Sequence, residues 1–275
     1  MINTPPESGE GDHPGDLKTF NKKKISSKED SKRMENIEGW VGSKEILVIL
    51  AHPDDPEFFL GGTIARWIKA GHQVRYLLLT KGDKGAKDIN LDFDTITRTR
   101  ITEQNNAASF LGVKSVEYLD YEDGYIYPEL ALRKLIVREI RKLRPDILVT
   151  CDPTNIFPSD RYINHPDHRY TGQAVIDGVF PAAGNHFFFP ELLSEGYDPH
   201  EVEEVWMSLT IQPDHVLDVT EYWQTRLDAL KKHASQVGEP QAFEKYMLER
   251  LGIAEGEPFT YEEKFRVIKF RRKPE

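Results

Sequence analysis

Cysteine is almost absent from this chain: Cys151 is the single one among 275 residues. One thiol can form neither an intrachain disulfide nor a thiolate zinc site. Long apolar runs are missing as well, since none approaches the ~18 residues that a membrane helix requires. The N-terminal segment lacks the apolar core of a secretory signal. These absences predict a cytoplasmic protein without a membrane span.

Positive charge is scarce relative to negative charge. The formal net charge is −10, and residues 1–43 hold eight acidic and seven basic side chains, so nearly all of the excess lies in the rest of the chain. An acidic body argues against nucleic acid or an anionic membrane surface as a partner. Nucleotide motifs are absent too. No Gly-x-Gly-x-x-Gly follows the first predicted strand, and the glycine-containing segment 81–85 has no Gly-Lys-Ser/Thr.

The first 43 residues differ in composition from the rest. They are rich in Pro, Gly, Ser, Lys, Asp and Glu and show little apolar periodicity. Such a segment cannot bury enough surface to offset the entropy lost on ordering. We therefore expect a flexible polar tail over residues 1–43 and one folded domain over residues 44–275. A body of this length can bury one sizeable core.

The folded part alternates between predicted strands and helices. Apolar runs that end in polar turns predict strands over residues 46–51, 73–80, 115–119, 146–150, 202–210 and 216–219. Helical patterns cover residues 64–71, 94–111, 129–143, 173–179, 222–233 and 242–251, followed by a Gly/Pro loop and a basic end. This alternation predicts an α/β fold: a Rossmann-like, mostly parallel sheet with helices on both faces.

The strand over residues 46–51 ends in a dense polar group, His52-Pro53-Asp54-Asp55. Ligands of open parallel sheets bind outside the carboxyl ends of the strands, where this group would lie. A plain capped turn would explain one aspartate and the proline, but neither His52 nor the second carboxylate. Adjacent carboxylates repel each other unless a cation lies beside them. We therefore expect a divalent metal here.

A second polar group, His165-Pro166-Asp167-His168, follows the strand over residues 146–150. The carboxyl ends of parallel strands lie on the same side of a sheet, so one of these histidines can meet His52 and one aspartate around a metal. Two imidazoles and a carboxylate with an open position are the ligand set of a catalytic site. The same set matches the facial triad of non-haem iron oxygenases, which usually adopt all-β barrels.

Both groups, together with Gly61-Gly62-Thr63, resemble the motifs of the PIG-L/LmbE-like family of zinc-dependent N-acetylglucosamine deacetylases. The similarity extends from about Lys44 to about Gln236. Shorter matching pieces include Arg100-x-x-Glu103, Asp120-Tyr121-x-Asp123-Gly124, Arg144-Pro145-Asp146 and His233-x-Ser235-Gln236. The two main motifs in combination are specific to this family.

The resemblance implies that His52, Asp55 and His168 bind the metal, which is Zn²⁺ by family, while Fe²⁺ or Mn²⁺ also suits these ligands. It implies that Asp54 is the general base acting on the metal-bound water. Metal binding lowers the pKa of water from about 15.7 to about 7. A carboxylate that is not itself a ligand must then accept the proton.

The resemblance also assigns roles around this centre. His165 would stabilise the oxyanion or protonate the leaving amine, with Asp167 orienting it. Arg100 and Asp123 match positions that contact the sugar substrate. One departure stands out: many members carry Glu directly after the two aspartates, whereas here Pro56 follows and the glutamate is displaced by one position. The metal ligands are expected to be unaffected, while the start of the following helix differs.

We therefore predict a metal-dependent hydrolase that removes an acetyl or related acyl group from an N-acylated sugar or glycoconjugate, cleaving a linear amide C–N bond. Two alternatives stay open: an iron oxygenase-type site, and a non-catalytic sugar-binding module on the same fold. Relatives include oligomers, so a homo-oligomer is compatible with the family.

Overall fold

The computed structural model describes residues 38–86, 88–254 and 257–270. Residues 1–37 of the predicted tail therefore lie outside the described residues. The chain divides into two units, Met1–Val41 and Gly42–Glu275, and the fold given below is that of the second unit.

Within the described residues, seven strands form one sheet in the order β3-β2-β1-β4-β5-β7-β6. Their bounds are β1 Glu45–Leu50, β2 Gln73–Thr80, β3 Ser115–Tyr121, β4 Ile147–Cys151, β5 Glu204–Ser208, β6 His215–Asp218 and β7 Glu262–Lys269. The neighbours from β3 to β5 pair in parallel, and β7 pairs antiparallel with both β5 and β6. The predicted α/β fold with a mostly parallel sheet is confirmed.

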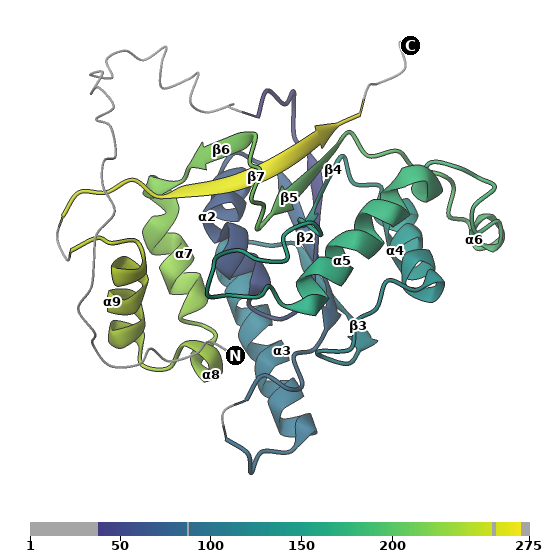
Figure 1. Ribbon diagram of the computed structural model, residues 1–275. Coiled ribbons are helices and arrows are strands. Elements are labelled where there is room, and N and C mark those ends of the chain that lie inside the picture. The colour runs from purple at the N-terminus through teal and green to yellow at the C-terminus, as the bar shows by residue number, and fades with distance from the viewer. Residues whose placement is uncertain (1–37, 87, 255–256, 271–275) are drawn as a thin grey trace. The chain divides into compact units, whose positions relative to one another are not determined.

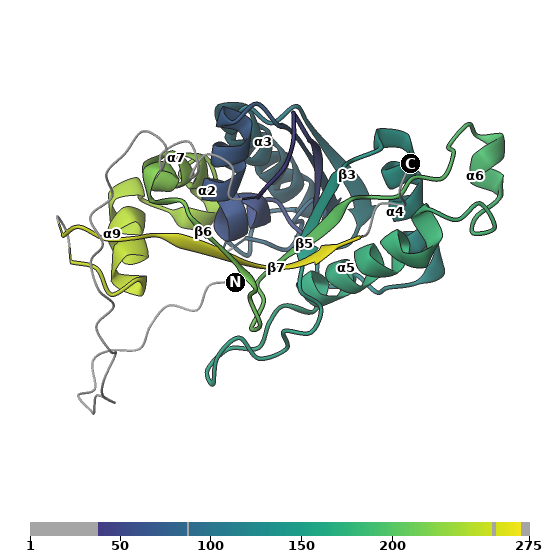
Figure 2. The same ribbon diagram turned by 90° about the horizontal axis from the view of Figure 1, so that it is seen from above.

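The helices cover both faces of this sheet. They are α2 Asp55–Lys69, α3 Phe93–Leu111, α4 Leu130–Leu143, α5 Pro166–Asp177, α6 Glu191–Ser194, α7 Trp223–Leu230, α8 Ala234–Val237 and α9 Pro240–Arg250, with the π-helical turn η1 at Gly178–Ala183. Figure 1 shows α2, α3 and α7 on one side and α4 and α5 on the other, and Figure 2 shows the same division from above. Helices within each group contact one another.

Strand β1 lies at the centre of the core. Successive side chains of a strand point to opposite faces. Leu47 and Ile49 pack into the cluster formed with α4 and α5, and the intervening side chains of β1 are equally buried on the α2 face. Burial on both faces explains why the run is apolar without alternation.

The strand order places the polar motifs at the topological switch point of the sheet. The chain leaves β1 for β2 on one side, and β4 pairs with β1 on the other. The helices that follow β1 and β4 lie on opposite faces, which opens a crevice at the carboxyl ends of the two strands. His52 follows β1, and α5 follows the loop after β4.

Several elements differ from the sequence expectation, among them α2, which was predicted from residue 64 and begins at Asp55. The helix predicted from about Gln173 begins at Pro166, so the second histidine motif forms the helix N-terminus rather than a loop. The strand β7 was not predicted, since the same region was expected to be a loop with a basic end. Residues 271–273 of that basic end, which was predicted over residues 269–273, lie outside the described residues.

Strand β7 stabilises a break in helix α2. The helix departs from helical geometry at Leu60, which has φ −152° and ψ 27°. A new helix start exposes backbone N–H groups that need acceptors. The N–H groups of Gly62 and Thr63 donate to the two carboxylate oxygens of Glu263 at 3.0 and 2.7 Å. Only glycine fits at position 62, because a Cβ there would lie 2.7 Å from the Val219 side chain.

Candidate active site

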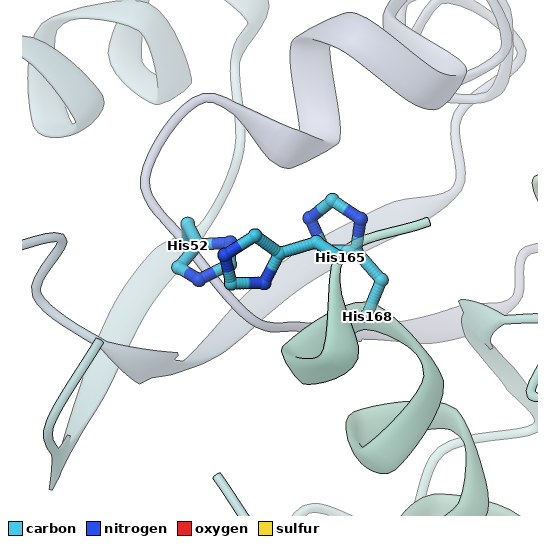
Figure 3. Close-up of side chains that lie close together, drawn as sticks. All are labelled: His52, His165 and His168. Atoms are coloured by element: carbon cyan, nitrogen blue, oxygen red, sulfur yellow. The ribbon is translucent and has the colours of Figure 1, made fainter. Parts of the chain in front are cut away.

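The two histidine motifs converge at the carboxyl ends of β1 and β4. Figure 3 shows the imidazoles of His52, His165 and His168 grouped together, the first after β1 and the other two at the start of α5. Ring centroids lie 4.8 Å apart for His52 and His165, and 5.2 Å apart for His52 and His168. The structure therefore brings together residues more than a hundred positions apart in the chain.

Asp55 lies between two of these histidines. One of its oxygens is 3.1 Å from His168 Nε2 and the other is 3.4 Å from His52 Nδ1. Burial alone would raise the pKa of Asp55, but His168 and His52 hold it well below its ordinary value. All three predicted metal ligands are buried and face one another.

Hydrogen bonds determine which nitrogen of each imidazole is free. His168 Nδ1 is 3.2 Å from the amide oxygen of Asn164, whose own NH₂ donates to the Asn155 carbonyl. An amide oxygen only accepts, so Nδ1 carries the hydrogen and Nε2 keeps its lone pair toward Asp55. His52 Nε2 is 3.2 Å from carboxylate oxygens of Asp123 and Asp167, which leaves Nδ1 as the free nitrogen. Such outer partners orient metal-binding histidines.

The donor set fits a divalent cation. Two imidazole nitrogens and a carboxylate are free to bind, and ligand atoms of His52, His165 and His168 all lie within 4.8 Å of one another. Four carboxylates gather around this point, Asp54, Asp55, Asp123 and Asp167. Burying four carboxylates is unfavourable unless positive charge balances them, and the single guanidinium of Arg100 is not enough. A metal ion would supply it.

Asp54 points away from its neighbour and has an unusual backbone. It caps α2 with φ 88° and ψ −26°, in the left-handed region that costs a non-glycine residue about 1–3 kcal/mol. Its side chain lies 3.1 Å from Arg100 Nη2, and its backbone N–H donates to Gln104 Oε1 at 2.7 Å. Burial raises the pKa of Asp54, and Arg100 offsets part of the rise. A raised pKa suits a general base.

A buried network beneath Asp54 involves residues that the sequence analysis did not place. Glu57 is fully buried and accepts hydrogen bonds from Gln104 Nε2 at 3.1 and 3.2 Å, and it lies 3.1 Å from His233 Nε2. The displaced glutamate thus supports Asp54 through Gln104. The spacing of Arg100, Glu103 and Gln104 on one face of a helix was an available signal, since residues three and four apart share a face.

Arg100 reaches Asp54 because two glycines leave room for its guanidinium. A Cβ on Gly85 would lie 1.8 Å from Arg100 Nη1, and one on Gly82 would lie 2.9 Å from its Cζ. Arg100 also donates to the Pro53 carbonyl. The segment over residues 81–85 therefore packs directly against the Arg100 side chain.

Asp167 contacts both histidines by different groups. Its backbone N–H donates to His165 Nδ1 at 3.2 Å, whereas its carboxylate is 3.2 Å from His52 Nε2. The N–H groups of Gly124 and Ile126 also donate to that carboxylate. Burial, with His52 beside it, lowers the pKa of His165. His165 is oriented by the Asp167 backbone, and the carboxylate reaches a metal-ligand candidate instead.

Comparison with known proteins shows the family of this chain. The family model of PIG-L, GlcNAc-PI de-N-acetylase, matches residues 47–179, a span that contains both histidine motifs. The diacetylchitobiose deacetylase of Thermococcus kodakarensis is 36% identical over 196 residues, which cover 71% of each protein. The chain belongs to the PIG-L family.

Solved structures share the fold. The N,N'-diacetylchitobiose deacetylase of Pyrococcus horikoshii matches with a TM-score of 0.71 and 26% identity, covering 90% of this chain and 94% of that one. The 4-carboxy-2-hydroxymuconate hydratase GalB of Pseudomonas putida matches with a TM-score of 0.63 and 20% identity, covering 84% and 98%. Since fold alone hosts more than one reaction, function has to be argued from the site.

In the part of the chain that is described, no helix combines the length and apolar character needed to span a bilayer.

Proposed function

We propose that this protein is a metal-dependent deacetylase that hydrolyses the acetamide of an N-acetylglucosamine conjugate, a small-molecule substrate. The observation that carries this proposal is the convergence of His52, Asp55 and His168, with Asp54 next to them in the chain and paired with Arg100. The two diacetylchitobiose deacetylases named above, one of them 36% identical, support the same chemistry. We propose Zn²⁺ as the metal, while the ligand set also suits Fe²⁺ or Mn²⁺.

His52 Nδ1, one oxygen of Asp55 and His168 Nε2 would hold the metal. When bound, a divalent metal lowers the pKa of water from about 15.7 to about 7 and polarises an acyl oxygen. The Asn164 amide and the carboxylate beside His52 keep the two imidazoles in the binding tautomers.

Asp54 takes the proton of the attacking water. It is not among the candidate ligands, so its carboxylate is left to accept that proton. Arg100 fixes the Asp54 carboxylate at 3.1 Å, so the acceptor oxygen is positioned before the substrate arrives. Attack on the acyl carbon then needs no reorientation of the base.

His165 serves the other half of the reaction. Because Asp167 N–H donates to its Nδ1, the neutral ring carries its hydrogen on Nε2. That N–H can stabilise the oxyanion by donating a hydrogen bond. Protonation of the leaving amine by His165 would need the imidazolium form, with the proton removed from water as its source, so that acetamide and water become acetate and a protonated amine. Arg100 and Asp123 line the same site, and we propose that they contact the sugar.

Two other functions are less well supported. An oxygenase-type site would use the same ligands, but family membership and the α/β fold favour hydrolysis. A sugar-binding module without catalysis would not need a strained Asp54 held by a buried network. A cytoplasmic location and a homo-oligomeric state stay predictions from the sequence.

The direct test is acetate release from a panel of N-acetylglucosamine conjugates, in which the second group is a sugar, an inositol or a hydroxy acid. We expect release from at least one, its loss after chelation, and its recovery with Zn²⁺, Fe²⁺ or Mn²⁺. Tight sugar binding without acetate under any of these metals would instead establish a binding module.

A further inference from the structure

Two carboxylates meet one imidazole nitrogen in this site. His52 Nε2 lies 3.2 Å from Asp123 Oδ1 and 3.2 Å from Asp167 Oδ2. Nε2 carries a single N–H, which cannot form a full hydrogen bond with both carboxylates at once. The surroundings of the two carboxylates differ, because the Asp167 side chain is fully buried whereas 12% of the Asp123 side chain is exposed.

Asp167 is held on several sides. Its Oδ2 accepts the Gly124 N–H at 2.7 Å, and its Oδ1 accepts the Ile126 N–H at 3.3 Å. It also lies in the first turn of α5, where the helix dipole favours a negative charge. A carboxylate fixed in this way cannot turn to a substrate, so it offers His52 a permanent acceptor.

The same residue touches His165 only by its backbone N–H among the hydrogen bonds described. A change of the side chain at position 167 leaves that N–H in place. The two possible roles of Asp167, acting on His52 or acting on His165, can therefore be separated by substitution.

We propose that Asp167 is a positioning residue of the metal centre: its carboxylate holds His52 with the hydrogen on Nε2 and so turns Nδ1 toward Asp55. The same carboxylate ties the turn over residues 123–126 to that imidazole. Asp123 is the more exposed of the two acids. Its carboxylate is therefore free to leave His52 and to accept a hydrogen bond from a substrate hydroxyl instead. The inference rests on the metal site of the proposed function.

The substitution Asp167→Asn tests this assignment. An asparagine keeps the shape but replaces one acceptor oxygen by an NH₂ group, which would face the N–H groups that now surround the carboxylate. Loss of an outer partner of a metal-binding histidine typically weakens metal binding about 10–100-fold. We expect the Zn²⁺ dissociation constant, measured by competition with a chromophoric chelator, to rise by that factor.

Two matched variants serve as controls. Asp123→Asn changes the other carboxylate at His52, and Asp177→Asn makes the same exchange at the far end of α5, where the acid pairs with Arg133. Both should bind Zn²⁺ within about twofold of the wild type, while Asp123→Asn lowers turnover. An Asp167→Asn variant with wild-type Zn²⁺ affinity and a shifted pH dependence of kcat would overturn the proposal in favour of a role on His165.

A measurement on the wild type keeps the proposal testable if the variant does not fold. Nitrogen-15 NMR of the Zn²⁺-loaded protein should show the hydrogen of His52 on Nε2; a hydrogen on Nδ1 would refute the inference. Wild-type protein that binds no Zn²⁺ and releases no acetate would contradict the proposed function itself. Wild-type protein that does both, beside an Asp167→Asn variant of unchanged affinity, would contradict only the inference.

Discussion

Two adjacent carboxylates in this site have different partners because the backbone turns sharply between them. Asp54 takes a left-handed conformation, which directs its side chain to Arg100, while Asp55 opens the helix and faces the histidines. The hydrogen bond from Asp54 N–H to Gln104 helps to hold the strained conformation. Strain of this kind persists only where the surrounding structure imposes it.

Asp54→Asn should therefore retain the metal and lose catalysis. The amide has the same shape but cannot accept the proton of water, and removal of a general base typically costs about 10²–10⁴ in rate. We expect Zn²⁺ affinity close to that of the wild type and acetate release lower by this factor. The comparison variant His168→Ala should instead lose the metal. Wild-type turnover by Asp54→Asn would show that the base is another group.

Gly85→Ala should reduce activity by moving Arg100. The added methyl would lie 1.8 Å from Arg100 Nη1, so the guanidinium must shift away from Asp54. We expect a lower kcat/KM for acetate release. In a double-mutant cycle, Gly85→Ala should add little to the effect of Arg100→Lys, because both act on one contact. Fully additive losses would show that the glycine acts elsewhere.

At the scale of helices and strands, prediction succeeded where the apolar pattern was uninterrupted. Strand β2 occupies the predicted residues Gln73–Thr80, and the predicted end of α3 at Gly112 has the left-handed cap that glycine allows. The start of α5 was placed too late. Its first turns carry His and Asp side chains that face the site, so the apolar periodicity is absent there, although Pro166 at the first position favours a helix start.

Strand β7 was missed because a charged residue occupies a core position. Glu263, Phe265 and Val267 are the buried side chains of its alternating pattern, and the glutamate hides the period of two. The burial of Glu263 is offset because its carboxylate accepts hydrogen bonds from the N–H groups of Gly62 and Thr63, about 200 residues earlier in the chain. A contact of that range leaves no trace in the local pattern.

Glu263→Ala should destabilise the protein strongly. The change removes the acceptor for two backbone N–H groups of α2 and leaves Arg226, only 3% exposed and 3.6 Å from Glu263, without this partner. Breaking a buried ion pair from one side costs about 3–5 kcal/mol. We expect a loss of this size in the free energy of unfolding, measured with urea.

The matched control is Glu262→Ala on the same strand. Glu262 is exposed and pairs with Lys264 at 3.6 Å. Surface substitutions of this kind stay within about 0.5 kcal/mol. Equal effects of the two variants would mean that the strand, rather than the carboxylate at position 263, carries the stability.

At the scale of the whole molecule, the site exists because the sheet brings two distant loops to one edge. The sequence indicated that the strands before His52 and His168 end on the same side, but not that β1 and β4 are direct neighbours. Contacts such as Asp167 with His52 were beyond sequence reasoning, because they depend on rotamers in the folded chain. Topology left open which aspartate and which histidine of the second motif join His52, the family resemblance named Asp55 and His168, and the contacts that support these side chains needed coordinates.

A metal held by His52 and His168 would join β1 to α5 and should therefore stabilise the fold. A ligand that binds only the native state adds about 2.7 kcal/mol at a hundred times its Kd. We expect Zn²⁺ to raise the Tm of chelator-treated protein, followed by circular dichroism. His168→Ala should abolish this rise, whereas His186→Ala, which removes an exposed histidine, should keep it. If Zn²⁺ still raised the Tm of His168→Ala, the metal would have to bind at another site.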